Sequence, residues 1–248
     1  MSSPPADDRS PPQTTSSLDV FLLGTLDLGA AMSLEERMRI EIAGRSDTHG
    51  SIIVCEHPPS VTIGREGSFA DVLVDREELV SRGIEVRWVN RGGGTFVHLP
   101  GQLSVYVVVP LERLNLGLVS YRSALENSVI AMAAELKVTA ERGSVAPGSV
   151  CRCGQFAFIG AAVRDGVSHG GLHVNVSLPQ DVLDLIRWTD SGVRVTSLSS
   201  QRTRPTALPT VRESLIRNIA RSLGYEGYNI YTGHPLLHRT VRKVYVYA

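Results

Sequence analysis

Three consecutive glycines, Gly92 to Gly94, constrain the fold of this chain more than any other feature. They lie in a twelve-residue segment, residues 91–102, which begins with Arg91, contains His98 and ends beside a Pro-Gly turn. Consecutive glycines carry a large conformational-entropy cost, so they are useful mainly where the backbone approaches another group closely or adopts positive φ. We therefore expect this segment to lie against a ligand.

The familiar glycine-rich nucleotide motifs do not explain this segment. It lacks the terminal Gly-Lys-Ser/Thr of a phosphate loop, and no G-x-G-x-x-G opens a helix. Its glycines lie between two expected strands, where backbone N–H groups and the side chains of Arg91 and His98 can contact a flat or extended ligand. The alternative interpretation is a glycine-rich β-bulge that carries a surface histidine.

Local patterns in the first half of the chain predict two short helices and four strands. The capping box Ser33-x-x-Glu36 predicts a helix to about Ala43, and Asp75-x-x-Glu78 predicts a helix that ends at Gly83. Apolar and β-branched runs predict strands at 51–55, 61–65, 84–89 and 103–109. The last two strands flank the glycine segment, so we expect them to pair with each other.

The second half predicts longer helices and a hairpin. Apolar residues at helical spacing indicate helices over 118–136 and 209–223. Strands at 156–163 and 172–176 flank the turn 164–166, which is typical of a β-hairpin, and a short strand is expected at 243–247. Antiparallel hairpins mixed with separate helices favour an α+β fold over a doubly wound parallel sheet.

Composition narrows the class of protein. Residues 1–16 are rich in Pro, Ser and Thr and are expected to form a disordered tail, with 17–248 as a single domain. The 25 basic and 25 acidic residues balance, so we expect no binding to nucleic acid or to a membrane. No apolar run reaches the roughly 20 residues that span a bilayer, and three cysteines are an odd count, so a cytoplasmic, reduced protein is expected.

Four motifs in order carry a family resemblance. They are Glu56-His57-Pro58-Pro59-Ser60-Val61-Thr62-Ile63-Gly64-Arg65, the Arg-Gly-Gly segment with His98-x-Pro100-Gly101-Gln102, Ala157-x-Ile159-Gly160, and Asn175-Val176. Together they resemble the octanoyltransferases of lipoate biosynthesis, which are relatives of the lipoate and biotin protein ligases. The resemblance covers about 51–198 and implies a mixed, largely antiparallel sheet flanked by helices.

The resemblance also implies an activity. Members of this family take an octanoyl group from acyl carrier protein and give it to a lysine of a lipoyl domain, as found in 2-oxoacid dehydrogenases or the glycine cleavage protein, without a cofactor or metal. The reaction passes through a cysteine thioester, and a nearby lysine lowers the pKa of the thiol. Carried over to this sequence, the acyl pocket comprises Arg91, Gly92, Gly93, Gly94, Thr95, Phe96, Val97, His98, Phe158, Ile159, Gly160, Gly171 and Leu172.

The catalytic pair of the family is absent from its usual positions. Gln155 stands where the family has its lysine, two residues before the Ala-x-Ile-Gly run. The cysteine of the family's Pro-Cys-Gly turn is replaced by Trp188 or Thr189, with a one-residue ambiguity from the length of the turn. Smaller departures are Leu99 in place of a glycine, and His169-Gly170-Gly171 in place of a single His-Gly.

An alternative is that a cysteine at another position of the chain serves as the nucleophile. If the strand through Phe156 begins early, Cys151, Cys153 and Gln155 share one face, with Cys153 about 7 Å from the position of the missing lysine. His98 or His169 would then act as its base. The alternative is that both cysteines are unreactive. His169 and His173 share a strand face, but their spacing with the cysteines matches no standard metal framework.

The absence of the usual catalytic pair leaves three hypotheses for the function. The first is an acyltransferase with an altered catalytic pair, and the second is an inactive family member that binds an acyl group, a lipoyl domain or a carrier protein. The third, an ATP-using ligase, is disfavoured because such ligases hold the adenylate phosphate with a lysine, and the chain contains only Lys137 and Lys243.

Overall fold

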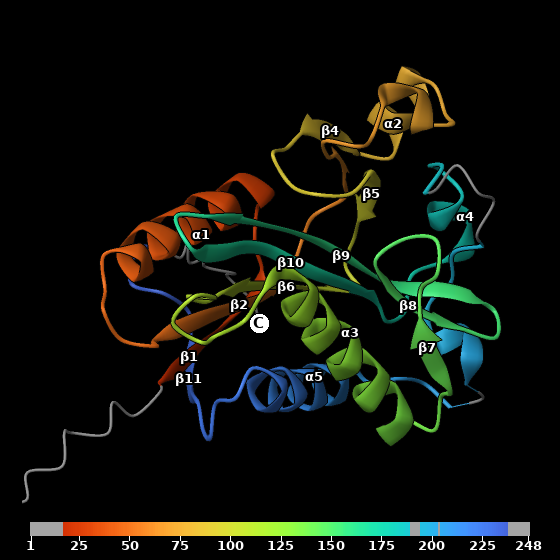
Figure 1. The fold of residues 1–248 in the computed structure, drawn as a ribbon. Helices are drawn as coiled ribbons and strands as arrows, with labels where there is room; N and C mark the ends of the chain where they lie inside the picture. The colour runs from red at the N-terminus through yellow and green to blue at the C-terminus, as the bar shows by residue number, and fades with distance from the viewer. Residues whose placement is uncertain (1–16, 189–193, 203, 238–248) are drawn as a thin grey trace, which may run out of the picture.

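The computed structural model describes residues 17–188, 194–202 and 204–237. These residues form two β-sheets with helices on both faces of the larger one (Figure 1). In spatial order the larger sheet contains β11 (Asn229–Thr232), β1 (Leu18–Thr25), β2 (Gly50–Glu56), β6 (Gln102–Val108), β10 (Val167–Asn175), β9 (Gly154–Arg164), β8 (Gly148–Cys151) and β7 (Ala140–Arg142). Strand β1 is parallel to both of its neighbours, and every other pairing in this sheet is antiparallel.

The smaller sheet has β3 (Ser60–Ile63) at its centre, parallel to β4 (Glu85–Trp88) and antiparallel to β5 (Thr95–His98). The expected pairing of 84–89 with 103–109 is wrong. The missed strand β5 lies between them in sequence and takes β3 as its partner, while β6 pairs with β2 and β10. The chain crosses from one sheet to the other through the turn at Gly101, whose φ is +97°.

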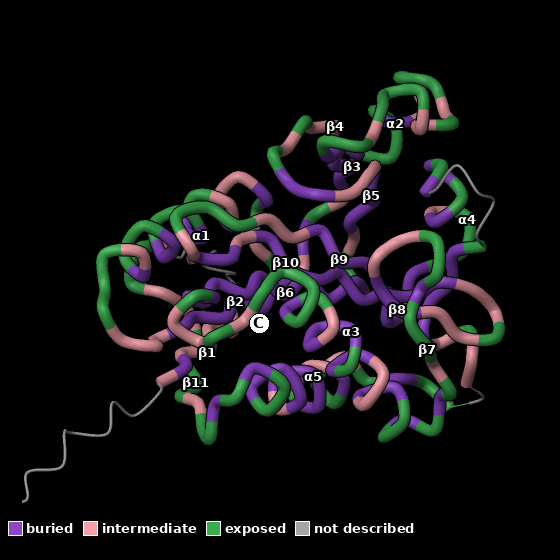
Figure 2. The backbone as a smooth tube through the Cα atoms, viewed as in Figure 1, coloured by how far each residue is buried: buried purple, intermediate pink, exposed green. Residues whose placement is uncertain are grey.

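Alternating side chains of the larger sheet build two apolar layers. Ile52 and Val54 of β2 pack towards α3 (Leu118–Glu135) and α5 (Leu208–Ser222), whereas Ile53 and Cys55 pack towards α1 (Leu28–Ala43). Strands β2, β6 and β10 are coloured as buried over most of their lengths in Figure 2. The α+β expectation is confirmed, as are the helices over 118–136 and 209–223.

Helix α1 starts earlier than predicted. Asp27 is its N-cap, and its carboxylate accepts from the N–H groups of Gly29 and Ala30. The predicted capping box at Ser33 is wrong because this residue lies inside the helix, six residues after the N-cap Asp27. The prediction for α2 (Arg76–Ser81) is confirmed, with Asp75 as its N-cap.

The β9–β10 hairpin is confirmed, and its turn is formed by Asp165 and Gly166, both at positive φ. The remaining elements are α4 (Gln180–Leu183) and two 3₁₀ turns, η1 (Phe69–Asp71) and η2 (Leu198–Gln201). Within the described ranges no helix is long and apolar enough to cross a membrane. The expected tail at 1–16 and the expected strand at 243–247 lie outside the described residues.

Candidate functional site

A cavity of about 260 Å³ lies between α1, the glycine segment and the two sheets. Helix α1 contributes Leu28, Met32 and Glu35, and the smaller sheet contributes Thr62 and His98. The remaining wall consists mainly of Val89, Asn90, Arg91, Tyr106, Gly160, His169, Gly170 and His173. Most of these residues are far apart in sequence, so the cavity exists only once the sheets have assembled.

The glycine run allows the backbone to pack closely around Arg91. A Cβ atom on Gly92 would lie 2.8 Å from the carbonyl oxygen of Ala161, and Gly93 has a φ of +79°. A Cβ on Gly94 would meet nothing within 4 Å. Two of the three glycines are therefore needed for the path of the backbone, while Arg91 and His98 are the members of the segment that border the cavity.

Arg91 is a buried cation without a carboxylate partner among the described residues. Its guanidinium donates to the Thr62 carbonyl at 3.1 Å, to Thr62 Oγ1 at 2.7 Å and to the Gly92 carbonyl at 3.0 Å. Its Cζ atom lies 3.7 Å from the centre of the Phe96 ring. Burial lowers the pKa of Arg91 to about 9.

His98 is neutral, and both of its ring nitrogens are hydrogen-bonded. Its Nδ1 donates to Gln102 Oε1 at 2.8 Å, and its Nε2 accepts from Thr62 Oγ1 at 2.8 Å. Burial, with smaller contributions from His57 and Arg91, places the pKa of His98 well below its usual value. Because His98 is only 1% exposed, the alternative of a surface histidine on a β-bulge is wrong.

Two further histidines complete a cluster beneath α1. His57 accepts from the Tyr106 hydroxyl at 2.7 Å, and its other ring nitrogen donates to the Leu26 carbonyl. His173 is bonded through Nδ1 to Ser104 Oγ at 2.9 Å, and its ring centre lies 4.8 Å from that of His98. Burial lowers the pKa of His57 and places that of His173 well below its usual value, so both are neutral near pH 7.

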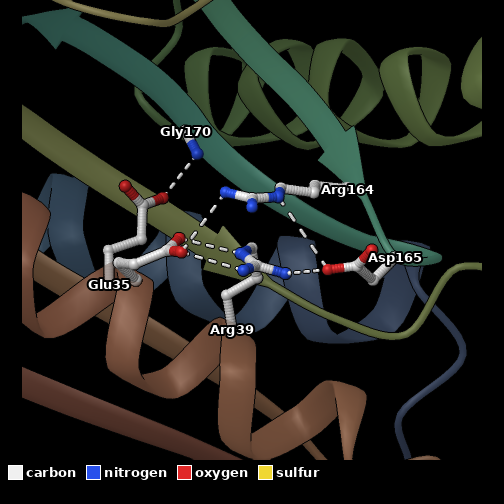
Figure 3. A network of polar contacts seen from close by, with 6 residues as sticks. Glu35, Arg39, Arg164, Asp165 and Gly170 are labelled. Carbon is white, nitrogen blue, oxygen red and sulfur yellow. Dashed lines mark hydrogen bonds and ion pairs between the residues drawn. The ribbon is translucent and has the colours of Figure 1, made fainter.

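Glu35 is the acidic member of the cavity wall. One of its carboxyl oxygens accepts from the N–H of Gly170. Its neighbour Glu36 is bound to Arg39 and faces Arg164, and Arg39 also contacts Asp165, so this network ties α1 to the β9–β10 hairpin (Figure 3). Burial raises the pKa of Glu35 to about 7. The sequence signal was a carboxylate on the apolar face of α1, one turn before Met38 and two before Ile42.

The structure separates the residues of the expected pocket. Only Arg91, His98 and Gly160 of that set border this cavity. Gly92, Gly93 and Ile159 border a second cavity of about 240 Å³ beside α3, while Thr95, Phe96, Val97, Phe158, Gly171 and Leu172 are buried in the packing around the site. Sequence reasoning missed Glu35, Thr62 and Tyr106, whose roles depend on tertiary contacts.

The cysteines do not lie along one strand. Cys151 ends β8 and Gly154 begins β9, so residues 152–153 form the turn of a tight hairpin. The expectation that Cys151, Cys153 and Gln155 share a strand face is therefore wrong, because the chain reverses through residues 152–153 and Gly154 already pairs with Cys151. The Cys151 thiol donates to the Gly154 carbonyl, its pKa is raised by burial, and neither cysteine borders the cavity under α1.

Gln155 and Trp188 are both part of the packed interior. Gln155 Nε2 donates to the Ala157 carbonyl at 3.1 Å, while its buried Oε1 has no partner among the described residues. The Trp188 ring stacks on Phe158 at 4.5 Å, and its Nε1 donates to the Leu183 carbonyl. Neither position supplies a thiol or an ammonium, and Thr189 lies outside the described residues. Among the residues that the structure describes, no group of three or more His, Cys, Asp or Glu is placed to hold a metal ion.

Comparison with known proteins gives concordant matches. The family model for the "Lipoyl protein ligase A/B catalytic domain" matches residues 27–220. The chain is 33% identical to an octanoyltransferase of Maridesulfovibrio salexigens over 72% of this chain and 84% of that protein. It is 34% identical to an octanoyltransferase of Geobacter metallireducens over 78% of this chain and 87% of that protein.

Solved structures show the same fold. A bipartite lipoate protein ligase from Thermoplasma acidophilum, studied with its E2 lipoyl domain, superposes with a TM-score of 0.71 at 19% identity, covering 89% of this chain and 88% of that chain. A lipoate-protein ligase A bound with ATP superposes with a TM-score of 0.68 at 18% identity, covering 89% and 90%. The expected ligase-like arrangement, a largely antiparallel sheet flanked by helices, is confirmed.

Proposed function

Because the chain belongs to the lipoyl protein ligase A/B catalytic domain family, we propose that it transfers an octanoyl or lipoyl group in protein lipoylation. The cavity under α1 carries this proposal. Arg91 and Gly160, from two motifs of the family resemblance, meet there, and the side chains of Leu28, Met32 and Val89 provide apolar wall. A cavity of mostly apolar lining with a few placed polar groups suits a medium-chain acyl group.

The proposed donor is octanoyl-acyl carrier protein, and the proposed acceptor is a lysine of a lipoyl domain. Two observations support this choice: the curated relatives named above are octanoyltransferases, and one structural neighbour was studied with an E2 lipoyl domain. Lipoyl domains of 2-oxoacid dehydrogenases and of the glycine cleavage protein both present such a lysine.

Transfer in this chain would use an altered catalytic pair. In the proposed reaction a thiolate of Cys153 or Cys151 attacks the donor thioester, the carrier thiol leaves, and the acceptor amine then displaces the enzyme thiol. The expected role of His98 as the base has no support from its geometry, because both of its ring nitrogens are bonded to Gln102 and Thr62. We assign His98 to the wall of the cavity.

The second candidate is a binding protein without transfer activity. Trp188 favours it, since its ring stacks on Phe158, which in turn contacts Phe96, and these rings fill the core next to the cavity wall. With Trp188 rather than Thr189 at the position of the family's nucleophile, the side chain there is an indole, which cannot form a thioester.

One experiment separates the two candidates. The protein is incubated with octanoyl-acyl carrier protein and a lipoyl domain, and both the protein and the domain are followed by intact mass. A transferase octanoylates the domain and loses this activity in a Cys151→Ala/Cys153→Ala variant. A binding protein leaves the domain unmodified, while octanoate still raises its Tm by mass action.

Two variants serve as controls. Gln155→Lys/Trp188→Cys restores the pair of the family and is expected to form an acyl-enzyme if the cavity delivers the acyl group to that position. Met32→Trp fills the cavity from the half-buried face of α1 and should abolish the Tm shift with octanoate. If octanoate and octanoyl-acyl carrier protein leave the parent protein unchanged in mass and in Tm, the proposed function is wrong.

A further inference from the structure

A groove at one edge of the larger sheet is lined largely by apolar side chains. It has a volume of about 1140 Å³ and lies over β1 and the edge strand β11 (Figure 1). Its apolar wall is formed by Phe21, Leu23, Leu26, Ile230, Tyr231 and Leu237, and none of its described lining residues is Asp, Glu, Lys or Arg. The side chains of Ile230 and Tyr231 are 55% and 44% exposed. Exposed apolar side chains that gather in one groove indicate an interaction site.

Helix α1 covers this part of the sheet only incompletely. Its apolar face packs on Ile53 of β2 and Tyr106 of β6. The side chains of β1 alternate between the two layers: Leu18 is fully buried on the side of α5, whereas Phe21 and Leu23, on the side of α1, are half-buried. The face of β1 and β11 beside α1 therefore keeps an apolar strip that the described elements do not bury.

The chain itself returns to this strip after β11. Gly233, at a φ of +86°, donates its N–H to the Leu22 carbonyl at 3.0 Å, and the His234 ring lies 4.9 Å from that of Phe21. The Leu237 N–H then donates to the His234 carbonyl at 3.0 Å, and the Leu237 side chain packs against the apolar layer under α1. Residues 238–248 lie outside the described residues, and by covalent continuity they start from the wall of the groove.

The eleven residues after Leu237 contain an apolar run. Residues 244–247 are two valines alternating with two tyrosines, a composition typical of an extended segment. Fully extended, eleven residues reach about 36 Å, whereas neighbouring strands lie about 5 Å apart, so the run can cross both β1 and β11. Valine suits an apolar groove, and a tyrosine ring can cover it while its hydroxyl stays in water.

The tether favours this segment over a separate molecule as the occupant of the groove. A segment joined to the wall at Leu237 meets the groove at an effective concentration on the order of 1 mM. A second copy of the chain reaches such a concentration only at comparable protein concentrations. The absence of charged side chains from the described lining also disfavours a strongly charged partner.

We propose that residues 241–247 lie in this groove as an extended segment, with apolar side chains against Phe21, Leu23 and Tyr231. The segment thereby covers the part of the sheet that α1 leaves open. The inference goes beyond the proposed function and does not depend on it, because it makes no use of the cavity under α1.

Photo-crosslinking in the full chain tests the proposal. With p-benzoylphenylalanine in place of Tyr245, illumination should link this position to residues 21–26 or 230–237 of the same chain, as read by peptide mass spectrometry. The control places the same residue at Val145, which is exposed between β7 and β8 at the opposite edge of the sheet and should link to none of residues 241–247. Links from position 245 to other regions or to a second copy, or no links at all, overturn the proposal.

A second measurement follows the exposure of the groove with the dye ANS. Full-length Val244→Ser/Val246→Ser should bind ANS severalfold more strongly than the parent, since the segment loses its apolar contacts. The matched control is Arg242→Ser/Lys243→Ser, which alters two charged residues of the same segment and should bind ANS as the parent does. A variant that ends at Leu237 should also bind more ANS, and the synthetic peptide 238–248 should reverse this gain. Equal ANS binding by the parent and the valine variant overturns the proposal.

Discussion

At the scale of single residues, the polar groups of the cavity differ from surface groups because burial sets their protonation states. Glu35 is held partly protonated near neutral pH, while His98 and His173 are held neutral. Arg91 keeps its charge by donating to carbonyl and hydroxyl oxygens rather than to a carboxylate. Each of these side chains was visible in the sequence, but its protonation state follows from the atoms around it.

The raised pKa of Glu35 predicts a pH-dependent stability difference. A carboxyl with a pKa of about 7 in the folded state and 4.5 as its ordinary value binds its proton more tightly when folded. The contribution of Glu35 to the stability of the folded state is therefore fully present below about pH 4.5 and is lost as the pH rises through 7. We expect the free energy of unfolding of Glu35→Gln, relative to that of the parent, to rise by about 3 kcal/mol between pH 4 and pH 9.

Urea unfolding of both proteins across this range measures the difference. Glu41→Gln, on the exposed face of α1, should show a constant offset from the parent. A flat difference curve for Glu35→Gln would show that Glu35 is ionised at neutral pH in the folded protein.

At the scale of elements, the glycine segment joins two sheets rather than simply lining a ligand. Strand β5 within it pairs with β3, and the turn at Gly101 carries the chain into β6 of the other sheet. The sequence predicted helices α2, α3 and α5 and the β9–β10 hairpin, because caps, periodicity and turn residues are local signals. It missed β5 because Thr95 to His98 were assigned to the ligand-contacting segment between the strands expected at 84–89 and 103–109.

Two alanine substitutions in this segment should behave differently. Gly92→Ala places a Cβ 2.8 Å from the Ala161 carbonyl oxygen, so the free energy of unfolding should fall by about 1–3 kcal/mol. Gly94→Ala meets nothing within 4 Å and should change it by less than about 0.5 kcal/mol. Chemical denaturation of the two variants checks this prediction, and equal losses would contradict the close approach of the segment to β9.

At the scale of the whole molecule, three neutral histidines beneath α1 make the fold sensitive to acid. Burial depresses the pKa of His98 and His173 well below 6.5, so the unfolded chain takes up protons that the folded chain does not. Their contribution to stability is present above about pH 6.5 and is lost as the pH falls below it. Glu35 has the opposite effect, because its contribution to the stability of the folded state increases as the pH falls through 7.

The acid sensitivity is best measured in the Glu35→Gln variant, where the opposing contribution is removed. We expect its free energy of unfolding to decrease steadily from pH 7 to pH 5. Replacement of His173 by Phe in that background should make the decrease shallower, since one proton-binding site of the unfolded chain is lost. An unchanged slope would mean that His173 binds its proton equally well in the folded and the unfolded chain.

The sequence by itself determined the family, the α+β class and most elements, because motif order, hydrophobic period and turn chemistry are properties of neighbouring residues. Its prediction for the cysteines failed because the chain reverses through residues 152–153, between Cys151 at the end of β8 and Gly154 at the start of β9. Only the tertiary structure decided which side chains form the cavity. Glu35, Thr62, His98 and His173 come from four elements, and their proximity, burial and protonation depend on how α1 and the two sheets pack.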